Sequence, residues 1–322
     1  MNDQNRQLST CTNNATTLQR CGTAPDLTGL QDWFNTPGDA AIDLADARGK
    51  VVLIDFWAYS CINCQRSVPH VVAWDDAYRD AGLTVIGIHS PEYAFEKSPA
   101  NVKAGAAALG IEYPVALDNN LSTWTNYRNR YWPAHYLIDA QGVVRNIQFG
   151  EGNYAATETM MRQLLREAHP DAALPTPTDL ADTTPVSSSS SGTITPESYL
   201  GTTKEVNFGG TQKYSSLTDS FDFPKKLAKN SFALSGDWSL QTQHISPTSE
   251  AAQVRLNYTA REVRMVLAGS GTVTISHGGT SRTISVSGVP RSYQLLRTQS
   301  LGSGTVDVSV GAGVQAFSFT FG

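Results

Sequence analysis

The stretch "KVVLIDFWAYSCINCQRSVP", residues 50–69, places two cysteines directly after a run of strand-forming residues. Residues 50–58 are a continuous run of β-branched and aromatic residues, which is typical of a strand buried on both faces. From Cys61 to about residue 81, apolar residues recur near helical spacing, and Pro69 is predicted to kink the middle. The sequence therefore predicts a strand, then the cysteine pair, then a helix that begins at Cys61.

Cys61 and Cys64 are compatible with a redox pair, half of a zinc site, or two buried structural cysteines. A structural zinc site needs four ligands, and the other cysteines, Cys11 and Cys21, lie forty residues upstream with nine residues between them. At a helix N-terminus, unpaired N–H groups and the helix dipole favour a thiolate. We therefore predict a redox pair in which Cys61 is the exposed nucleophile and Cys64, one turn later, resolves the mixed disulfide. No metal ion, and no cofactor other than this disulfide, is expected.

Before residue 169, predicted strands and helices alternate. A second buried strand is predicted over residues 83–90 and a capped helix over 98–110. Residues 135–150 indicate two strands around a turn at "DAQG", and residues 156–168 an amphipathic helix. This order indicates an α/β sheet with helices on both sides.

The composition changes sharply near residue 170. Residues 169–192 are rich in Pro, Thr and Ser and lack hydrophobic periodicity, so we predict an interdomain linker, extended at first and flexible at its serine run. Residues 193–322 alternate apolar and polar residues between Gly, Ser and Pro, which predicts an all-β sandwich of jelly-roll type with roughly 8–10 strands. The domains are then 1–168, the linker 169–192, and 193–322.

The net charge of −5 is divided unevenly between the two halves. Residues 193–322 hold 11 Lys+Arg against 8 Asp+Glu, and residues 1–192 hold 13 against 21. No basic stripe is interleaved with aromatic residues, so nucleic acid is not an expected partner. No apolar run reaches about 18 residues, and residues 1–22 show no apolar segment after a positive start. The sequence therefore predicts a cytosolic protein or a soluble part of a longer one.

The cysteine motif also resembles the active-site stretch of the thioredoxin superfamily. The resemblance is carried by Asp55 in the strand, by Trp57, and by Pro69, five residues after the second cysteine. Downstream, "RYWPAHYLIDAQGVV" (130–144) resembles the cis-proline loop of that family, with Pro133 as the candidate. The resemblance implies a thioredoxin-like fold, with a central mixed sheet flanked by helices, and protein disulfide oxidoreductase activity.

The segment between these motifs is similar to the TlpA/ResA branch of the superfamily. Several pieces resemble the extracytoplasmic C-terminal region of the actinobacterial DipZ family, which fuses a CcdA part to a thioredoxin-like part. These pieces are "EYAFEK" (92–97), "YPVALDNN" (113–120), "NYRNRYWPA" (126–134) and "FGEGNY" (149–154). In that family a β-sandwich resembling carbohydrate-binding modules follows the redox domain.

The DipZ resemblance implies an extracytoplasmic location, with membrane tethering in the full-length parent protein. It implies a CcdA-like membrane protein as electron donor and oxidised cysteines of envelope proteins as substrates, with apocytochrome c as a candidate. Ile62 and Asn63, between the cysteines, carry no charge, which argues against a strongly oxidising pair. We therefore expect reduction or exchange of disulfides.

The superfamily pattern also implies roles for residues around the dithiol. Asp55 shares a strand face with Val51 and Leu53, so burial of that face would raise its pKa and let it relay the proton of Cys64. The alternative is an aspartate that reaches solvent or a backbone donor. A cis bond before Pro133 would leave the preceding backbone free to pair with a substrate and would bar metal from the dithiol. The residues expected to contact substrate are Trp57, Tyr59, Ile62, Asn63 and Trp132.

Other ionisable residues near the motifs receive weaker assignments. Glu92 or Glu96 is a candidate second base, but a solvated loop charge is favoured. His70 and His135 are expected at the surface or in packing. A peroxidase is set aside, because Ile54 stands where the peroxiredoxin pattern requires a proline before its cysteine.

Cys11 and Cys21 bracket a polar stretch and are predicted to form a structural disulfide, worth roughly 2–3 kcal/mol. A second redox relay is the alternative. The disulfide would indicate an oxidising compartment. In the β domain, Trp238, Tyr258 and Tyr293 are candidates for stacking on sugar rings, although the pattern around Trp238 favours core packing.

The leading hypothesis is an extracytoplasmic thiol–disulfide oxidoreductase joined to a β-sandwich with carbohydrate as a candidate ligand. The rival hypothesis is an envelope glycan-binding or adhesion protein that uses the thioredoxin-like domain as a scaffold. Cys61→Ser separates them, because it removes disulfide reduction and leaves glycan binding intact.

Overall fold

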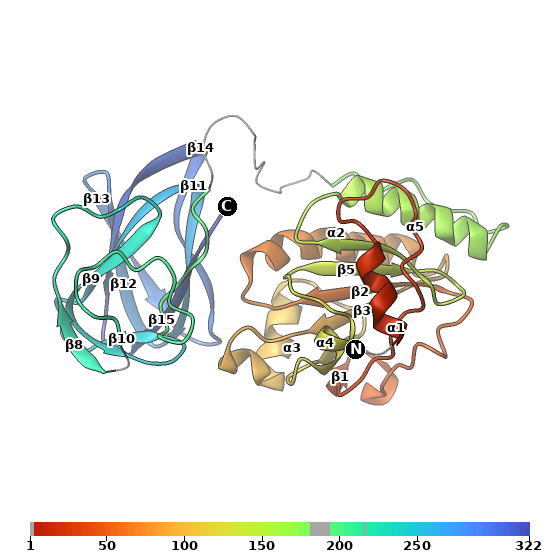
Figure 1. The fold of residues 1–322 in the computed structure, drawn as a ribbon, viewed down its shortest axis with the longest axis horizontal. Helices are drawn as coiled ribbons and strands as arrows, with labels where there is room; N and C mark the ends of the chain where they lie inside the picture. The colour runs from red at the N-terminus through yellow and green to blue at the C-terminus, as the bar shows by residue number, and fades with distance from the viewer. Residues whose placement is uncertain (1–2, 181–193, 216) are drawn as a thin grey trace. The chain divides into compact units, whose positions relative to one another are not determined.

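The computed structural model describes residues 3–180, 194–215 and 217–322 of the chain. The chain divides into two compact units, Met1–Thr184 and Pro185–Gly322, which we call the α/β unit and the β unit (Figure 1). The later part of the predicted linker lies outside the described residues. Its earlier part contacts the α/β unit, because the carbonyl of Pro175 and the amide of Thr178 bond to side chains of the last helix.

The α/β unit is built on a six-stranded mixed sheet, as the sequence predicts. Its order is β1–β4–β3–β2–β5–β6, in which β2, β3 and β4 are parallel while β1, β5 and β6 run antiparallel to their neighbours. The strands are Gln31–Phe34 (β1), Val51–Trp57 (β2), Leu83–His89 (β3), Val115–Leu117 (β4), Ala134–Ile138 (β5) and Val144–Phe149 (β6). Every residue of β2 is buried, as its apolar run indicates.

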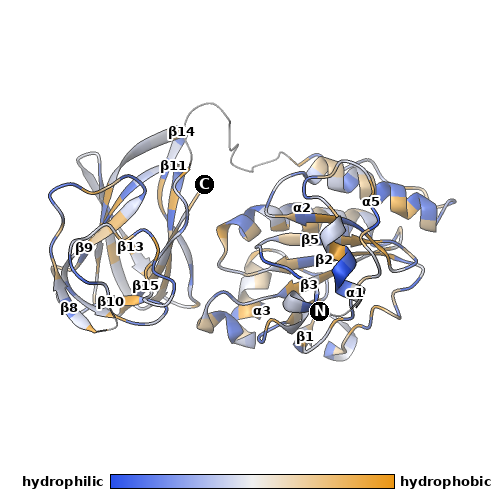
Figure 2. Ribbon diagram, viewed as in Figure 1, coloured by the Kyte–Doolittle hydropathy of each residue, from blue (hydrophilic) through white to orange (hydrophobic). Residues whose placement is uncertain are grey.

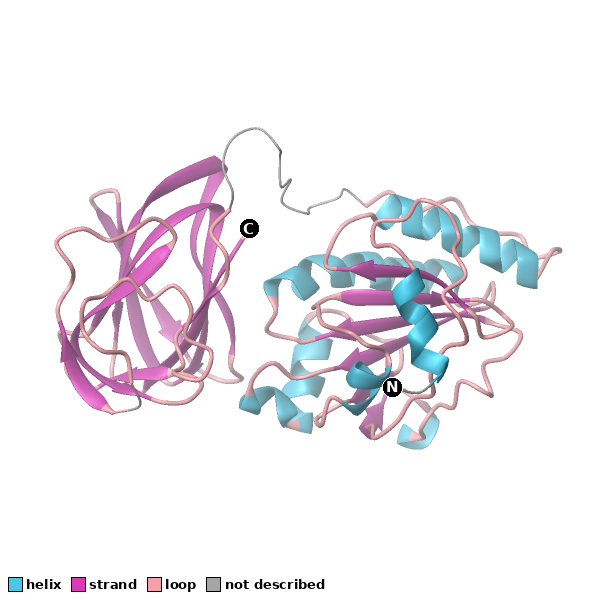
Figure 3. Ribbon diagram, viewed as in Figure 1, coloured by secondary structure: helices cyan, strands magenta, loops and turns pink. Residues whose placement is uncertain are grey.

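Helices and short turns surround this sheet (Figure 3). The α-helices are Asp3–Arg6 (α1), Ile62–Tyr78 (α2), Pro99–Ala108 (α3), Ser122–Asn126 (α4) and Tyr154–Ala168 (α5), and the 3₁₀ turns are Gln7–Thr10 (η1), Pro37–Asp39 (η2) and Ala94–Lys97 (η3). α2 and α5 pack on each other, since the rings of Trp74 and Tyr154 are 6.2 Å apart. Figure 2 shows hydrophilic and hydrophobic residues along α5, as an amphipathic helix requires.

The two faces of β2 have different neighbours because strand side chains alternate. Val52, Ile54 and Phe56 belong to an apolar cluster that includes Leu8 of the N-terminal segment. Asp55 therefore projects from the opposite face. The sheet thus carries an apolar layer on one side and its buried carboxylate on the other.

The β unit is all-β, as predicted. Its strands are Ser198–Tyr199 (β7), Thr218–Phe221 (β8), Ser231–Leu240 (β9), Ile245–Pro247 (β10), Gln253–Gly269 (β11), Gly271–His277 (β12), Thr280–Val286 (β13), Arg291–Val310 (β14) and Val314–Phe321 (β15). β9, β10, β15 and β11 pair in a closed ring and so form a small barrel, to which the other strands are added. The jelly-roll arrangement itself stays a prediction.

One strand of the β unit corrects the sequence analysis. The apolar–polar alternation predicts separate strands over 251–259 and 262–270, but the structure has one 17-residue strand here, β11. Register shifts between Ala260 and Glu262 and between Val263 and Arg264 bend it without ending it. Ala260 and Arg261, which separate the two predicted segments, therefore lie inside the strand at a bulge.

The candidate stacking residues of the β unit belong to its core. Trp238 is completely buried, and Tyr258 and Tyr293 are also buried. The Trp238 indole donates to the carbonyl of Ser235, and the Tyr293 hydroxyl donates to that of Ser287. These three rings therefore offer no exposed face to a sugar, which corrects their proposed role.

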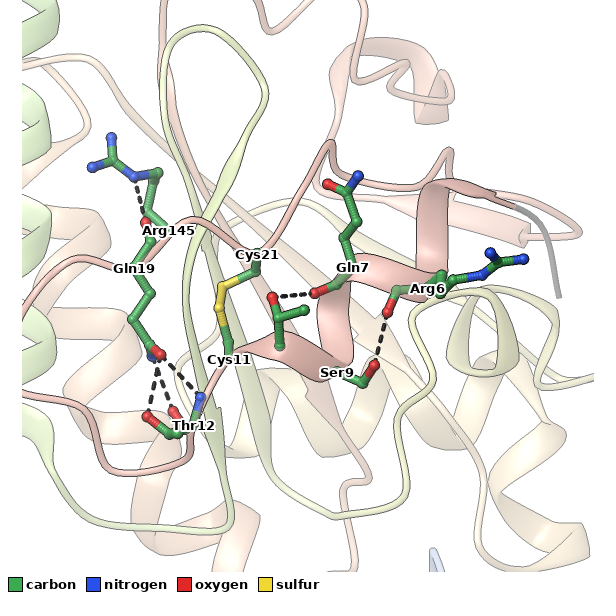
Figure 4. Close-up of a disulfide and its surroundings, with 9 residues drawn as sticks. Arg6, Gln7, Ser9, Cys11, Thr12, Gln19, Cys21 and Arg145 are labelled. Atoms are coloured by element: carbon green, nitrogen blue, oxygen red, sulfur yellow. Dashed lines mark hydrogen bonds between the residues drawn. A yellow bond between two sulfur atoms is a disulfide. The ribbon is translucent and has the colours of Figure 1, made fainter.

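A disulfide fixes the N-terminal segment against the edge of the sheet (Figure 4). Cys11 and Cys21 are bonded, and the Cys21 amide donates to the carbonyl of Val144 on β6. Gln19 extends this contact, since its amide donates to the Arg145 carbonyl and its side chain bonds to Thr12. The segment thus continues the sheet beyond β6.

We expect the double variant Cys11→Ala/Cys21→Ala to lower the free energy of unfolding of the α/β unit by about 2–3 kcal/mol, because the unfolded chain regains loop entropy. Urea titration followed by tryptophan fluorescence reports this unit, since five of the six tryptophans precede residue 181. An unchanged midpoint and slope would contradict the structural role.

Candidate active site

The two cysteines of the motif lie at the start of α2 in unequal environments. Cys61 is the residue before the helix, with extended backbone angles, and is partly exposed. Cys64 is completely buried, and both thiols are free. The helix continues directly from this point, since the Gln65 amide donates to the Cys61 carbonyl over 3.0 Å. A partner can therefore approach the first thiol and not the second.

Burial raises the pKa of the Cys64 thiol well above its ordinary value. The neighbouring Cys61 adds to the increase through a hydrogen bond and its charge, and Asp55 adds a smaller electrostatic effect. Cys64 is consequently protonated at neutral pH while it remains enclosed.

A buried polar network lies around Asp55, whose side chain is 1% exposed. Its Oδ2 accepts from the Tyr113 hydroxyl over 3.1 Å, and its Oδ1 lies 3.4 Å from Nε2 of His135. The same His135 nitrogen is 3.2 Å from Ser67 Oγ on α2. The carboxylate thus has hydroxyl and imidazole partners in an interior that excludes solvent.

Strand register explains how this network assembles. His135 is the residue of β5 directly opposite Asp55, and Gly87 is its partner on β3. A Cβ at Gly87 would lie 3.0 Å from both Trp57 Nε1 and Tyr113 Cε2. The missing side chain therefore lets Tyr113 reach the carboxylate. Sequence analysis missed Tyr113, but a glycine inside a buried strand is a signal of such close approach.

Glu96 corrects an expectation, since the favoured assignment of a solvated charge is wrong. The side chain is completely buried on η3. Its Oε1 accepts from the amide and hydroxyl of Ser60, and its Oε2 accepts from the amides of Glu92 and Tyr93. Burial first, and then the nearby Glu92, raise the pKa of Glu96 to about 7, while the hydrogen bonds act in the opposite direction. Glu96 thus ties η3 to the residue before Cys61.

His89 holds the same loop from β3. Its Nε2 accepts from the Tyr59 amide over 3.2 Å, and its ring stacks on that of Tyr59 at 5.8 Å. Burial lowers the pKa of His89 to about 3, so the ring is neutral and keeps the lone pair that this bond requires. Two buried side chains, His89 and Glu96, therefore fix consecutive amides ahead of Cys61.

The residues expected to contact substrate differ in exposure. Trp57, Tyr59 and Ile62 are buried, whereas Asn63 and Trp132 retain exposed surface. Asn63 Oδ1 accepts from Arg66, whose guanidinium also pairs with Glu151. Of these five residues, only Asn63 and Trp132 therefore have exposed surface that a partner protein can contact.

The predicted proline loop lies at the start of β5, next to the end of β2. The Trp132–Pro133 peptide bond is cis. The Trp132 indole donates to the Ser90 carbonyl and packs 4.2 Å from the Trp124 ring. The Pro133 carbonyl accepts from the Gly150 amide over 2.8 Å.

The two histidines expected at the surface or in packing are both buried. His70 stacks on Tyr154 with ring centroids 3.7 Å apart, so it is a packing residue. His135 packs edge-on against Trp74 at 6.2 Å and also belongs to the Asp55 network.

Among residues 3–180 and the described part of the β unit, no helix is both long and apolar enough to span a membrane.

Comparison with known families agrees with this geometry. Residues 22–147 match the model described as the AhpC/TSA family, and residues 195–322 match the one described as thioredoxin like C-terminal domain. Thiol-disulfide oxidoreductase YkuV of Bacillus subtilis is 31% identical over 143 residues, which cover 44% of this chain and 94% of YkuV. The chain belongs to the thioredoxin-like thiol–disulfide oxidoreductases, as the motif predicts.

Within that class, the predicted resemblance to DipZ is confirmed. Protein DipZ of Mycobacterium tuberculosis is 54% identical over 324 residues, which cover all of this chain and 46% of DipZ. Thiol-disulfide oxidoreductase ResA of Halalkalibacterium halodurans is 25% identical over 132 residues, 41% of this chain and 70% of ResA. The chain thus spans about half the length of DipZ.

The unequal cysteines predict unequal alkylation. Since a raised pKa lowers the thiolate fraction at a given pH, iodoacetamide at about pH 7 should modify Cys61 at least about tenfold faster than Cys64. In Cys61→Ser the remaining motif thiol should react appreciably only in alkaline buffer. Mass spectrometry of the trapped thiols measures both rates, with Cys64→Ser as control. Equal rates at neutral pH would contradict the assignment.

Glu96 predicts a pH-dependent stability. Its folded pKa of about 7 exceeds the ordinary 4.5, so the native state binds more protons between these values and the free energy of unfolding falls as pH rises. The slope from this group is at most about 1.4 kcal/mol per pH unit. Urea titrations across this range should show a smaller slope for Glu96→Gln. Parallel curves for wild type and variant would refute the prediction.

Proposed function

We propose that the α/β unit reduces disulfides of protein substrates, with Cys61 as nucleophile and Cys64 as resolving thiol. The observation that carries this proposal is the difference in exposure between the two thiols, since Cys61 is partly exposed and Cys64 is completely buried. Such a pair lets a partner meet one sulfur and hides the other until a mixed disulfide forms.

The reaction has two balanced steps. The Cys61 thiolate attacks one sulfur of the partner disulfide, so that a Cys61–partner bond forms and the other partner sulfur leaves as a thiolate and takes up a proton. Cys64 then loses its proton and attacks Cys61 Sγ, which releases the second partner thiolate and forms the Cys61–Cys64 disulfide. Two electrons pass from the dithiol to the partner, and an external dithiol must restore the reduced pair.

Asp55 is proposed to accept the proton of Cys64 in the second step. Its charge acts on the Cys64 thiol, and its carboxylate stays inside the unit with Tyr113 and His135 as partners. A carboxylate in this position can take up a proton that solvent cannot reach. The Pro133 loop is proposed to bind the backbone of the substrate next to its disulfide.

The relationship to DipZ supports a physiological setting. We propose that the unit works outside the cytoplasm, receives electrons from a CcdA-like membrane partner, and acts on envelope proteins that include apocytochrome c. The uncharged Ile62–Asn63 pair favours the reducing direction. Tethering of the full-length parent to a membrane, and carbohydrate binding by the β unit, stay predictions.

The glycan-binding hypothesis, with the α/β unit as a scaffold, stays the alternative. It requires an exposed aromatic platform or an equivalent cleft on the β unit, and the three aromatic candidates belong to the core. The buried ionisable groups around the dithiol favour catalysis, because a scaffold does not require them.

Cys61→Ser is expected to abolish insulin-disulfide reduction with dithiothreitol as donor, because no thiolate remains to form the mixed disulfide. Cys64→Ser is expected to accumulate that mixed disulfide, visible on a non-reducing gel. The matched control is Cys11→Ala/Cys21→Ala, which removes the other pair and should keep turnover at a temperature where it is folded. Full turnover by Cys61→Ser would overturn the assignment of Cys61 as nucleophile, and absence of turnover by the wild-type chain with any thiol donor would favour the scaffold.

A further inference from the structure

A cavity of about 290 Å³ lies beside the Pro133 loop, on the apolar side of the sheet. Leu8 of the N-terminal segment and Ile147 of β6 form apolar parts of its lining, and Tyr131 and Phe149 form aromatic parts. Arg128 and Arg130 complete the wall, and we call this cavity the arginine–aromatic pocket. Its volume is at the lower end of ligand sites, so it fits one side chain.

The pocket is lined by residues that neighbour the Pro133 loop in sequence and in strand pairing. Tyr131 precedes Pro133 by two residues, and Phe149 is the β6 partner of Ala134, the residue after Pro133. Ala134 also pairs with Phe56 near the end of β2, where the loop to Cys61 begins. The loop that is proposed to bind substrate backbone is therefore the same loop that supplies Tyr131 to the pocket.

The mouth presents an unusual surface for a folded chain. Tyr131 is 53% exposed, and its ring lies 5.1 Å from that of Phe149. Phe149 is partly buried against the apolar cluster, so an exposed ring lies on a fixed one, as in many recognition surfaces. The pocket is therefore suited to an aromatic or large aliphatic side chain.

The charge of the pocket lining indicates which residues of a partner would lie beside the bound side chain. Arg130 is exposed, and Arg128 donates to Ser9 Oγ over 3.3 Å, so both positive charges lie along the lining. None of the described residues that line the pocket is acidic. Residues 1–192 carry 21 acidic against 13 basic residues, so this local positive charge opposes the charge of its own unit. It favours acidic groups on the partner.

We propose that the arginine–aromatic pocket recognises substrate proteins by an aromatic or large aliphatic side chain that lies near the reacting cysteine and has acidic residues beside it. The proposal rests on the proposed reaction at Cys61 and adds a sequence preference to it. It assigns the loop before Pro133 two tasks, backbone binding at the proline and side-chain selection two residues earlier.

Three fluorescein-labelled peptides test this, each with serine in place of the substrate cysteine. One carries Phe-Glu-Glu beside the serine, one Phe-Lys-Lys, and one Ala-Glu-Glu. The full chain is expected to bind the first about threefold to tenfold more tightly than the other two, as partly exposed charge pairs and one ring allow. About 0.5 M salt should remove the preference for acidic over basic peptide.

Two variants and one control test whether Arg130 and Tyr131 cause these peptide preferences. Arg130→Glu should abolish or reverse the preference for acidic peptide, and Tyr131→Ala should abolish the preference for Phe over Ala. The matched control is Arg166→Glu, an exposed arginine on α5, which should leave all three affinities unchanged. Equal binding of the three peptides by wild type, or an unchanged preference in Arg130→Glu, would overturn the proposal.

A separate measurement distinguishes this proposal from the proposed function. Hydroxyethyl disulfide has no side chain to fill the pocket, so its reduction by the wild-type chain reports the Cys61–Cys64 reaction alone. Failure of that reduction would refute the proposed function, whereas the peptide affinities would still decide whether the pocket selects acidic aromatic segments.

Discussion

The pairing of β2 with β3 on one side and β5 on the other is the constraint from which the site follows. This register places His135 opposite Asp55 and leaves only the hydrogen of Gly87 on the other side, so a buried carboxylate gains two partners in place of solvent. The same strand ends just before Cys61. Because β2 is buried on both faces, the position of residues 58–60, which follow it, is also restricted. These residues in turn position the Cys61 thiol.

Burial keeps His89 neutral and makes the charge of Glu96 sensitive to pH near neutrality. His89 must be neutral to accept from the Tyr59 amide, and burial ensures this. Glu96 accepts from four donors when ionised, so a proton on it would remove an acceptor from one of them. The loop ahead of Cys61 is therefore held by side chains whose charge depends on enclosure, and access of water to this region would weaken its geometry.

The parts of the site encoded by local pattern could be predicted from the sequence, and the parts made by distant residues could not. An apolar run followed by two cysteines at helical spacing identifies β2 and the start of α2, because these are short-range features. The burial of Glu96 depends on where η3 folds back, which no local pattern states. In the β unit, bulges let one strand continue through residues 260–261, where the pattern predicts two strands, whereas the strand pattern around Trp238 already favours the burial that the structure shows.

The α/β unit holds two cysteine pairs, Cys11–Cys21 and Cys61–Cys64. A reductant that acts on the second pair also meets the first. Cys21 is completely buried and held to β6 through its amide, whereas Cys11 is partly exposed, so Cys11 is the more accessible sulfur of this disulfide. Attack there would require a Cys21 thiolate to depart into an apolar interior, which is unfavourable for a charged leaving group. We therefore expect this disulfide to be reduced more slowly than the Cys61–Cys64 pair, because one of its two sulfurs is a poor leaving group.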